Sequence, residues 1–236
     1  AASGKVSATP NSNPIGMALD TAGADGDLIE VLRLKEPVGG TDEVGGLSLF
    51  DDFMVDAPAA ATALNYAYTK TETNGLGVIS SDEANGVLKF SFDAVAEAAT
   101  ADLYLANAPF DIDSGPIFDC RLAIFDIGDD AALDINFGMA SGTHATDADS
   151  IAESAFFHLD GTALDLLVES DDGTTEVAAT DSTINLVDDQ YDEFRIDITD
   201  KAAVKFFHRA TGALTWVRIL AATTFDISAY TGTLTP

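Results

Sequence analysis

Residues 194–208 read FRIDITDKAAVKFFH, and this stretch decides the fold class. Phe194, Ile196 and Ile198 alternate with polar residues, and Val204–His208 forms a second apolar run. Successive side chains of a β-strand point to opposite faces, so a period of two predicts strands with one buried face. The glycine-containing turn Ala210-Thr211-Gly212 follows, and then a further expected strand at Thr215–Ile219.

The same pattern of short apolar stretches separated by turn residues continues through most of the chain. Asn85-Gly86, Asp160-Gly161 and Asp171-Asp172-Gly173 are turn sequences, the last two of them hairpin turns. We expect strands at 87–92, 118–127, 133–139, 155–159, 164–169 and 174–178. Strands at this spacing predict an all-β, antiparallel sandwich. The alanine-rich segments 57–63 and 95–101 fit either short helices or loose connections.

The N-terminal residues differ in composition from the rest of the chain. Residues 1–14 are small, polar and interrupted by proline, which predicts an extended arm. Residues 15–38 predict a small β segment, because Leu28–Leu34 alternates, whereas Ile15–Leu19 fits either a strand or a helical turn. Residues 39–46 are rich in glycine and predict a linker, which leaves 47–236 for the sandwich.

The charge of the chain excludes several kinds of partner. The formal net charge is −29, from 40 acidic and 11 basic residues. Binding to nucleic acid needs lysine and arginine to neutralise phosphates, and anionic membranes repel an acidic protein. The acidity fits solubility, attraction to a basic partner surface, or both. With no apolar stretch of transmembrane length and no signal-peptide pattern, we expect synthesis in a cytoplasm.

The residues that carry chemistry show no catalytic pattern, so we expect no enzyme activity. The acids Asp134, Asp192, Glu193 and Asp197 lack the spacing of a glycosidase pair and are interpreted as solvated. His158 and His208 end apolar runs, which favours hydrogen-bonded structural histidines over zinc ligands, and His144 stands apart.

Three further features have structural interpretations. Cys120, the single cysteine, is expected to be a buried thiol, and Trp216 a core residue. The paired aspartates are expected to stabilise turns. Calcium is the one ion that they leave open, and no cofactor is expected. These aspartates are Asp25/Asp27, Asp111/Asp113, Asp129/Asp130, Asp147/Asp149 and Asp171/Asp172.

Two stretches resemble known families. LFDDF at 49–53, NGVLKF at 85–90, NFGM at 136–139 and YDEFRID at 191–197 are similar to concanavalin A-like jelly-roll sandwiches. The stretch GMALDTAGADGDLIEVL at 16–32 resembles a segment of tailed-phage capsid decoration proteins. That resemblance implies a small β domain on the outer capsid surface, often trimeric, with the jelly roll as the larger domain.

The resemblance leads to a specific functional hypothesis. We expect a decoration protein on the outer surface of the virion that binds the major capsid protein and stabilises the shell. The candidate capsid-contact residues are Lys5, Val6, Ile15, Met17, Leu28 and Val31. The alternative is a lectin-like module that binds glycans or recognises a host. A glycoside hydrolase or lyase is the weakest hypothesis, since the carboxylate pattern is missing.

Overall fold

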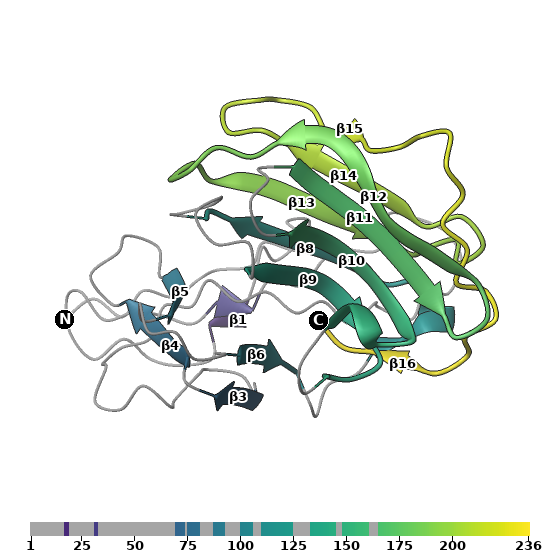
Figure 1. Cartoon of the computed structure of the whole chain (residues 1–236), viewed down its shortest axis with the longest axis horizontal. Helices are drawn as coiled ribbons and strands as arrows, with labels where there is room; N and C mark the ends of the chain where they lie inside the picture. The colour runs from purple at the N-terminus through teal and green to yellow at the C-terminus, as the bar shows by residue number, and fades with distance from the viewer. Residues whose placement is uncertain are drawn as a thin grey trace, which may run out of the picture. The chain divides into compact units, whose positions relative to one another are not determined.

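The strand Asp192–Asp197 (β13) shows why this sequence forms a sandwich. Phe194 and Ile196 are fully buried, while Arg195 and Asp197, which alternate with them, are partly exposed. β13 is an inner strand of a four-stranded antiparallel sheet, which confirms the strand predicted from the alternation at 194–198. The order in this sheet is β15 (Val217–Arg218), β14 (Lys205–Arg209), β13 and β8 (Ile117–Leu122) (Figure 1).

The architecture comes from a computed structural model. It describes residues 17–18, 31–32, 69–73, 75–80, 87–92, 100–105, 110–124, 133–144, 148–160 and 165–236. The chain divides into two compact units, Ala1–Phe50 and Asp51–Pro236. The predicted boundaries at 14/15, 38/39 and 46/47 lie outside the described residues.

A second four-stranded antiparallel sheet forms the other half of the sandwich. Phe157 pairs with Val168 on one side and with Phe137 on the other, so the hairpin predicted around Asp160-Gly161 is confirmed. The spatial order is β12 (Glu176–Asn185), β11 (Asp165–Asp172), β10 (Glu153–Asp160) and β9 (Asp134–Ala140).

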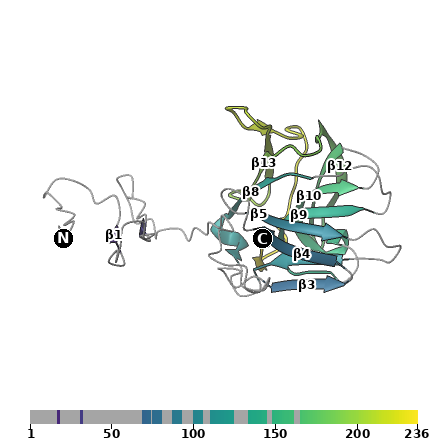
Figure 2. The ribbon, with the colours of Figure 1, turned by 90° about the vertical axis from the view of Figure 1, so that its left-hand side faces the viewer.

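The two sheets pack through phenylalanine rings. Phe137 and Phe157 come from one sheet, and Phe194 and Phe206 come from the other. Phe157 meets Phe194 and Phe206 edge-on, with ring centroids 5.2 and 5.3 Å apart. Figure 2 shows β8 and β13 on one side of this body, with β10 and β12 on the other. The rings join the inner faces into one apolar core.

The C-terminal residues hold the edge of the second sheet. Thr233–Leu234 (β16) pairs with Phe110–Asp111 (β7), which leads into the short 3-10 helix Ile112–Ser114 (η1). Thr235 exchanges two backbone hydrogen bonds with Ala140 at the end of β9, at 2.8 and 2.9 Å. Edge strands present unpaired backbone groups, so this contact satisfies part of the β9 edge.

The other strand pairs in the described residues are smaller. Each is two-stranded and antiparallel, and the pair with β5 confirms the strand predicted at 87–92. The alanine-rich segment 57–63 lies outside the described residues, and of 95–101 only its last two residues are described, as part of β6. The pairs are β1 (Met17–Ala18) with β2 (Val31–Leu32), β3 (Thr69–Thr73) with β6 (Thr100–Tyr104), and β4 (Gly75–Ser80) with β5 (Val87–Phe92).

Some strands differ in length from their predictions. β12 reaches Asn185, beyond the expected 174–178, because it is a mostly exposed strand whose polar sequence resembles a turn. A register shift and the positive φ of Thr183 (64°) bend it. β15 is limited to Val217–Arg218, and β8 ends at Leu122. Of the strand predicted at Leu28–Leu34, only Val31–Leu32 is described.

The described chain is therefore an all-β antiparallel sandwich. Helix is limited, in these residues, to η1 and the 3-10 helix Ala148–Ser150 (η2). No helix in this part of the chain combines the length and apolar character needed to cross a membrane. The jelly-roll topology stays a prediction.

Truncation of the central ring tests this packing. F157A should lower the free energy of unfolding by about 3–5 kcal/mol, because it leaves a cavity between the sheets. V187A, at a side chain that is 55% exposed, should change it by no more than about 0.5 kcal/mol. Urea unfolding measured by tryptophan fluorescence compares the two variants, and an equal effect would contradict the packing.

Candidate functional site

Basic side chains gather on the outward face of the β15–β14–β13–β8 sheet. Arg121 and Arg209 are both in register with Glu193, and Lys205 is in register with Asp197. These positions alternate with the buried residues of the same strands, so they face away from the core. We call this surface the arginine face, and its five basic residues, of eleven in the chain, are Arg121, Arg195, Lys205, Arg209 and Arg218.

Ion pairs and a tryptophan order part of the arginine face. Arg195 binds both oxygens of Asp119, at 2.6 and 2.8 Å, and this hydrogen bonding raises the pKa of the arginine. The guanidinium carbons of Arg195 and Arg209 lie 4.7 and 4.8 Å from the ring centre of Trp216. The prediction that Trp216 is a core residue is therefore wrong, since the partly exposed ring supports the two arginines instead.

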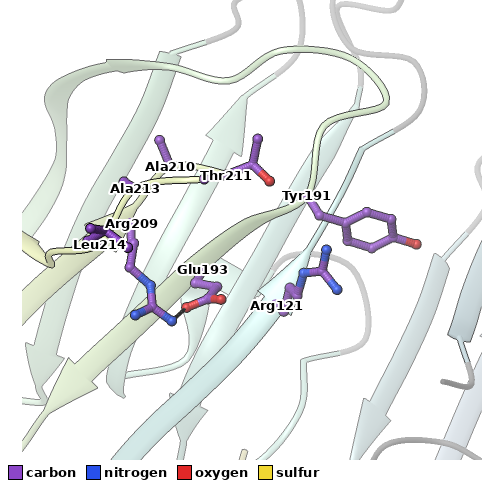
Figure 3. A pocket seen from close by; sticks show the side chains of 9 residues that line it. Arg121, Tyr191, Glu193, Arg209, Ala210, Thr211, Ala213 and Leu214 are labelled. Atoms are coloured by element: carbon purple, nitrogen blue, oxygen red, sulfur yellow. Dashed lines mark hydrogen bonds and ion pairs between the residues drawn. The ribbon is translucent and has the colours of Figure 1, made fainter.

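A shallow pocket of about 360 Å³ opens beside these residues. Figure 3 shows Arg209, Glu193 and Arg121 in a row below the turn that follows β14, with Tyr191 beside Arg121. Arg209 is paired with Glu193. The lining residues are Arg121, Tyr191, Glu193, Arg209, Ala210, Thr211, Gly212, Ala213 and Leu214.

Arg121 gives the pocket its chemical character. Its guanidinium carbon lies 4.6 Å from the ring centre of Tyr191, and no carboxylate of the described residues forms an ion pair with it. A guanidinium group binds a carboxylate through two parallel hydrogen bonds. The pocket therefore combines a hydrogen-bond donor for anions, an aromatic ring and the 93% exposed side chain of Leu214.

A buried aspartate and histidine support the turn over the pocket. Asp192 accepts hydrogen bonds from His208 Nε2 at 3.0 Å and from the Thr211 backbone N–H at 2.8 Å. Burial opposes its ionisation, but these bonds and one from Gln190 outweigh burial and lower the pKa of Asp192. The structural interpretation of His208 is confirmed, whereas Asp192, which is 4% exposed, is not a solvated acid.

The other predicted acids have separate surroundings. Glu193 pairs with Arg209, and Asp197 accepts hydrogen bonds from Thr199. Asp134 lies near His158 on the second sheet. Glu193, Asp197 and Asp134 thus have different partners and do not converge on one another. Glu193 and Asp197 lie on the arginine face.

His158 is buried but is not the hydrogen-bonded histidine that its position predicts. It is 5% exposed, and neither ring nitrogen has a hydrogen-bond partner in the described residues. Asp134, Asp149 and Glu169 surround the ring at 3.3 to 3.6 Å. Burial disfavours the charged ring, but these carboxylates outweigh burial and raise the pKa of His158.

The described aspartate loops behave mainly as turn formers. Asp111 accepts a hydrogen bond from the Asp113 backbone N–H at 2.9 Å, and Asp171 accepts one from Gly173 at 2.8 Å. Asp172 binds the backbone N–H groups of Thr174, Thr175 and Ala229. The predicted turn role is confirmed for these residues, while Asp25, Asp27, Asp129, Asp130 and Asp147 lie outside the described residues.

The remaining predicted residues are Cys120, in the sandwich, and the capsid-contact candidates, in the N-terminal unit. Cys120 packs against the core between the sheets, and burial raises the pKa of its thiol, so it is a structural cysteine as predicted. Among the capsid-contact candidates, Met17 lies in β1 and Val31 in β2, which pair. Lys5, Val6, Ile15 and Leu28 lie outside the described residues.

Removing the buried carboxylate charge tests the support of the pocket turn. D192N should cost about 1–3 kcal/mol of unfolding free energy at pH 7, because buried hydrogen bonds are lost. The lowered pKa of Asp192 means that its contribution is complete above the unfolded pKa of about 4 and disappears as the pH falls through the folded value. Unfolding of wild type and D192N should therefore converge toward pH 2.

Denaturant titrations between pH 7 and pH 2 measure this convergence. D189N, at an exposed aspartate with positive φ that asparagine tolerates, is the control and should follow wild type throughout. A constant difference between wild type and D192N at every pH would contradict the role of the Asp192 carboxylate.

Comparison with known proteins adds no relative from which a role could be transferred. No protein-family model, curated protein or solved structure matches the chain.

Proposed function

We propose that the protein is a capsid decoration protein, which attaches to the outer surface of a virus shell through its N-terminal unit. One observation carries the proposal. Within the stretch 16–32, which resembles a segment of phage decoration proteins, the described residues Met17–Ala18 (β1) and Val31–Leu32 (β2) pair antiparallel, with Met17 in register with Leu32. That resemblance implies a small β domain, and a β pair within the stretch supports the proposal.

Backbone pairing supplies a physical mechanism for attachment. In the described part of the N-terminal unit, β1 and β2 have two residues each and pair with each other, and a sheet of only two strands is at best marginally stable in water. A shell protein that adds a strand to this pair would supply further backbone hydrogen bonds. In this proposal the unit Ala1–Phe50 attaches to the shell, and the sandwich belongs to the other unit, Asp51–Pro236.

Repetition and charge support the same function. Many copies on one shell let weak individual contacts hold together, because bound neighbours raise the effective concentration of each site. The net charge of −29 would attract a basic shell surface and would keep decorated particles apart. In this proposal the major capsid protein is the partner, and a trimer is the expected assembly.

Shells that lack this protein provide the test. Deletion of residues 1–36 should abolish co-sedimentation with them. V31P should weaken it at least tenfold, because proline removes a backbone N–H and is poorly tolerated in paired strands. The matched control S7P lies in the predicted arm, outside the β pair, and should bind like wild type. Full binding by the deletion variant would refute the proposal.

The pocket of the arginine face favours a second function, the binding of an acidic glycan. Arg121 supplies hydrogen-bond donors for an anion, Tyr191 supplies an aromatic surface, and residues 210–214 line the pocket. Sugars that carry a carboxylate, such as uronic or sialic acids, match this combination. This function would serve host recognition and is compatible with decoration.

A glycan array of neutral and acidic sugars tests the second function. Wild type should prefer acidic glycans, and R121A should lose at least tenfold in affinity, as expected for a charge-assisted hydrogen bond. R218A removes a charge from the same face but from outside the pocket lining, and should bind within about twofold of wild type. Equal losses in both variants would rule out a site at Arg121.

A further inference from the structure

A buried polar cluster lies on the other sheet, on the face that points away from the phenylalanine core. His158 is in β10, between Phe157 and Leu159, which point into the core, so its ring points to the opposite face. The ring is nevertheless buried. Residues 148–151, which include η2, pack on this face, where Ala148 and Ile151 contact a small apolar cluster with Phe156.

Three carboxylates from three different elements surround this ring. Asp149 of η2 and Glu169 of β11 lie on the Nδ1 side, with oxygens 3.3 and 3.6 Å from Nδ1. Asp134 of β9 lies on the Nε2 side, at 3.4 Å. A single ring nitrogen and one oxygen each of Asp134 and Asp149 also lie within 4.8 Å of one another.

The hydrogen bonding of this cluster is incomplete. Both ring nitrogens of His158, Glu169 Oε1 and Asn136 Oδ1 are buried without a hydrogen-bond partner in the described part of the chain. The Asn136 amide group is fixed, since its nitrogen donates to Asp134 Oδ1 at 2.7 Å. Buried polar atoms in folded proteins nearly always have a partner, so a bound ion or an ordered water is expected to complete the bonding of this group.

The spacing of the atoms suits a metal ion. Bonds of about 2.1 Å to nitrogen and oxygen place the ligand atoms of a tetrahedral site about 3.4 Å apart. The oxygens of Asp149 and Glu169 lie 3.3 and 3.6 Å from Nδ1, which is the nitrogen–oxygen spacing of such a site. An imidazole nitrogen favours zinc and similar transition metals, whereas calcium and magnesium prefer oxygen ligands alone.

We propose that His158 Nδ1, Asp149 and Glu169 bind one divalent transition-metal ion such as Zn²⁺. Asp134, whose Oδ1 lies 3.4 Å from Nε2, would accept the Nε2 hydrogen once the ion orients the ring, in the arrangement common at metal-bound histidines. The ion joins η2 to β10 and β11, so it fastens residues 148–151, the covering segment, to the sheet. This site does not depend on attachment to a shell or on the pocket of the arginine face.

Titration of the metal-free chain with Zn²⁺, Mn²⁺ and Ca²⁺ tests the proposal. Isothermal titration calorimetry at pH 7 should show one Zn²⁺ per chain with a dissociation constant in the micromolar range or below, and Ca²⁺ at least 100-fold weaker at this site. H158Q should abolish the tight Zn²⁺ site. H144Q, at an exposed histidine, should keep it and is the matched control.

Two further variants separate the ligands from the orienting residue and guard against misfolding. D149N changes a partly exposed residue of the covering segment, and should weaken Zn²⁺ binding at least 100-fold while circular dichroism stays unchanged. D134N should weaken it about 10- to 100-fold, as expected when the partner of a metal-bound histidine is lost. The proposal is overturned if wild type does not bind Zn²⁺ tightly, in which case His158 is a protonated histidine among acids. It is also overturned if wild type, H158Q and D149N bind Zn²⁺ equally.

Discussion

The packing of phenylalanine rings between the two sheets is the constraint on which the rest of the structure depends. Phe157 meets Phe194 and Phe206 from the facing sheet at centroid distances of 5.2 and 5.3 Å, which fixes the sheets against each other. Because side chains alternate along a strand, burial of these rings also fixes what points outward. Arg195, next to Phe194, is presented to solvent, and His158, next to Phe157, is directed under η2.

The two outer faces differ although they follow from the same alternation. On the arginine face, basic side chains outnumber the acids Asp119, Glu193 and Asp197, which leaves a positive surface on a chain of net charge −29. On the other sheet, carboxylates gather around one buried histidine. The first arrangement suits an anionic partner and the second suits a cation. The two outer faces of one sandwich therefore suit ligands of opposite charge.

The fold was largely predictable from local pattern, and the sites were not. The alternation at Phe194–Ile198 and the turn Asp160-Gly161 predict strands that the structure contains, since both signals lie within a few residues. The neighbours of His158 come from positions 134, 149 and 169, which only the pairing of β9, β10 and β11 and the packing of η2 bring together. The sequence does not reveal the burial of Asp192, because its partners His208 and Thr211 lie across a hairpin. It does not reveal the position of Trp216 either, because two arginines, rather than the core, cover the ring. The outward positions of Arg121 and Arg195, opposite the apolar residues of their strands, were visible in the sequence.

The role of the N-terminal unit is the central functional claim, and an image of the decorated shell tests it most directly. Shells lacking the protein would be incubated with the full chain and reconstructed by cryo-electron microscopy. We expect ordered density on the outer surface, in which the β1–β2 pair contacts the shell. Density that joins the shell through the sandwich alone, or a bare shell at saturating protein, would contradict this claim.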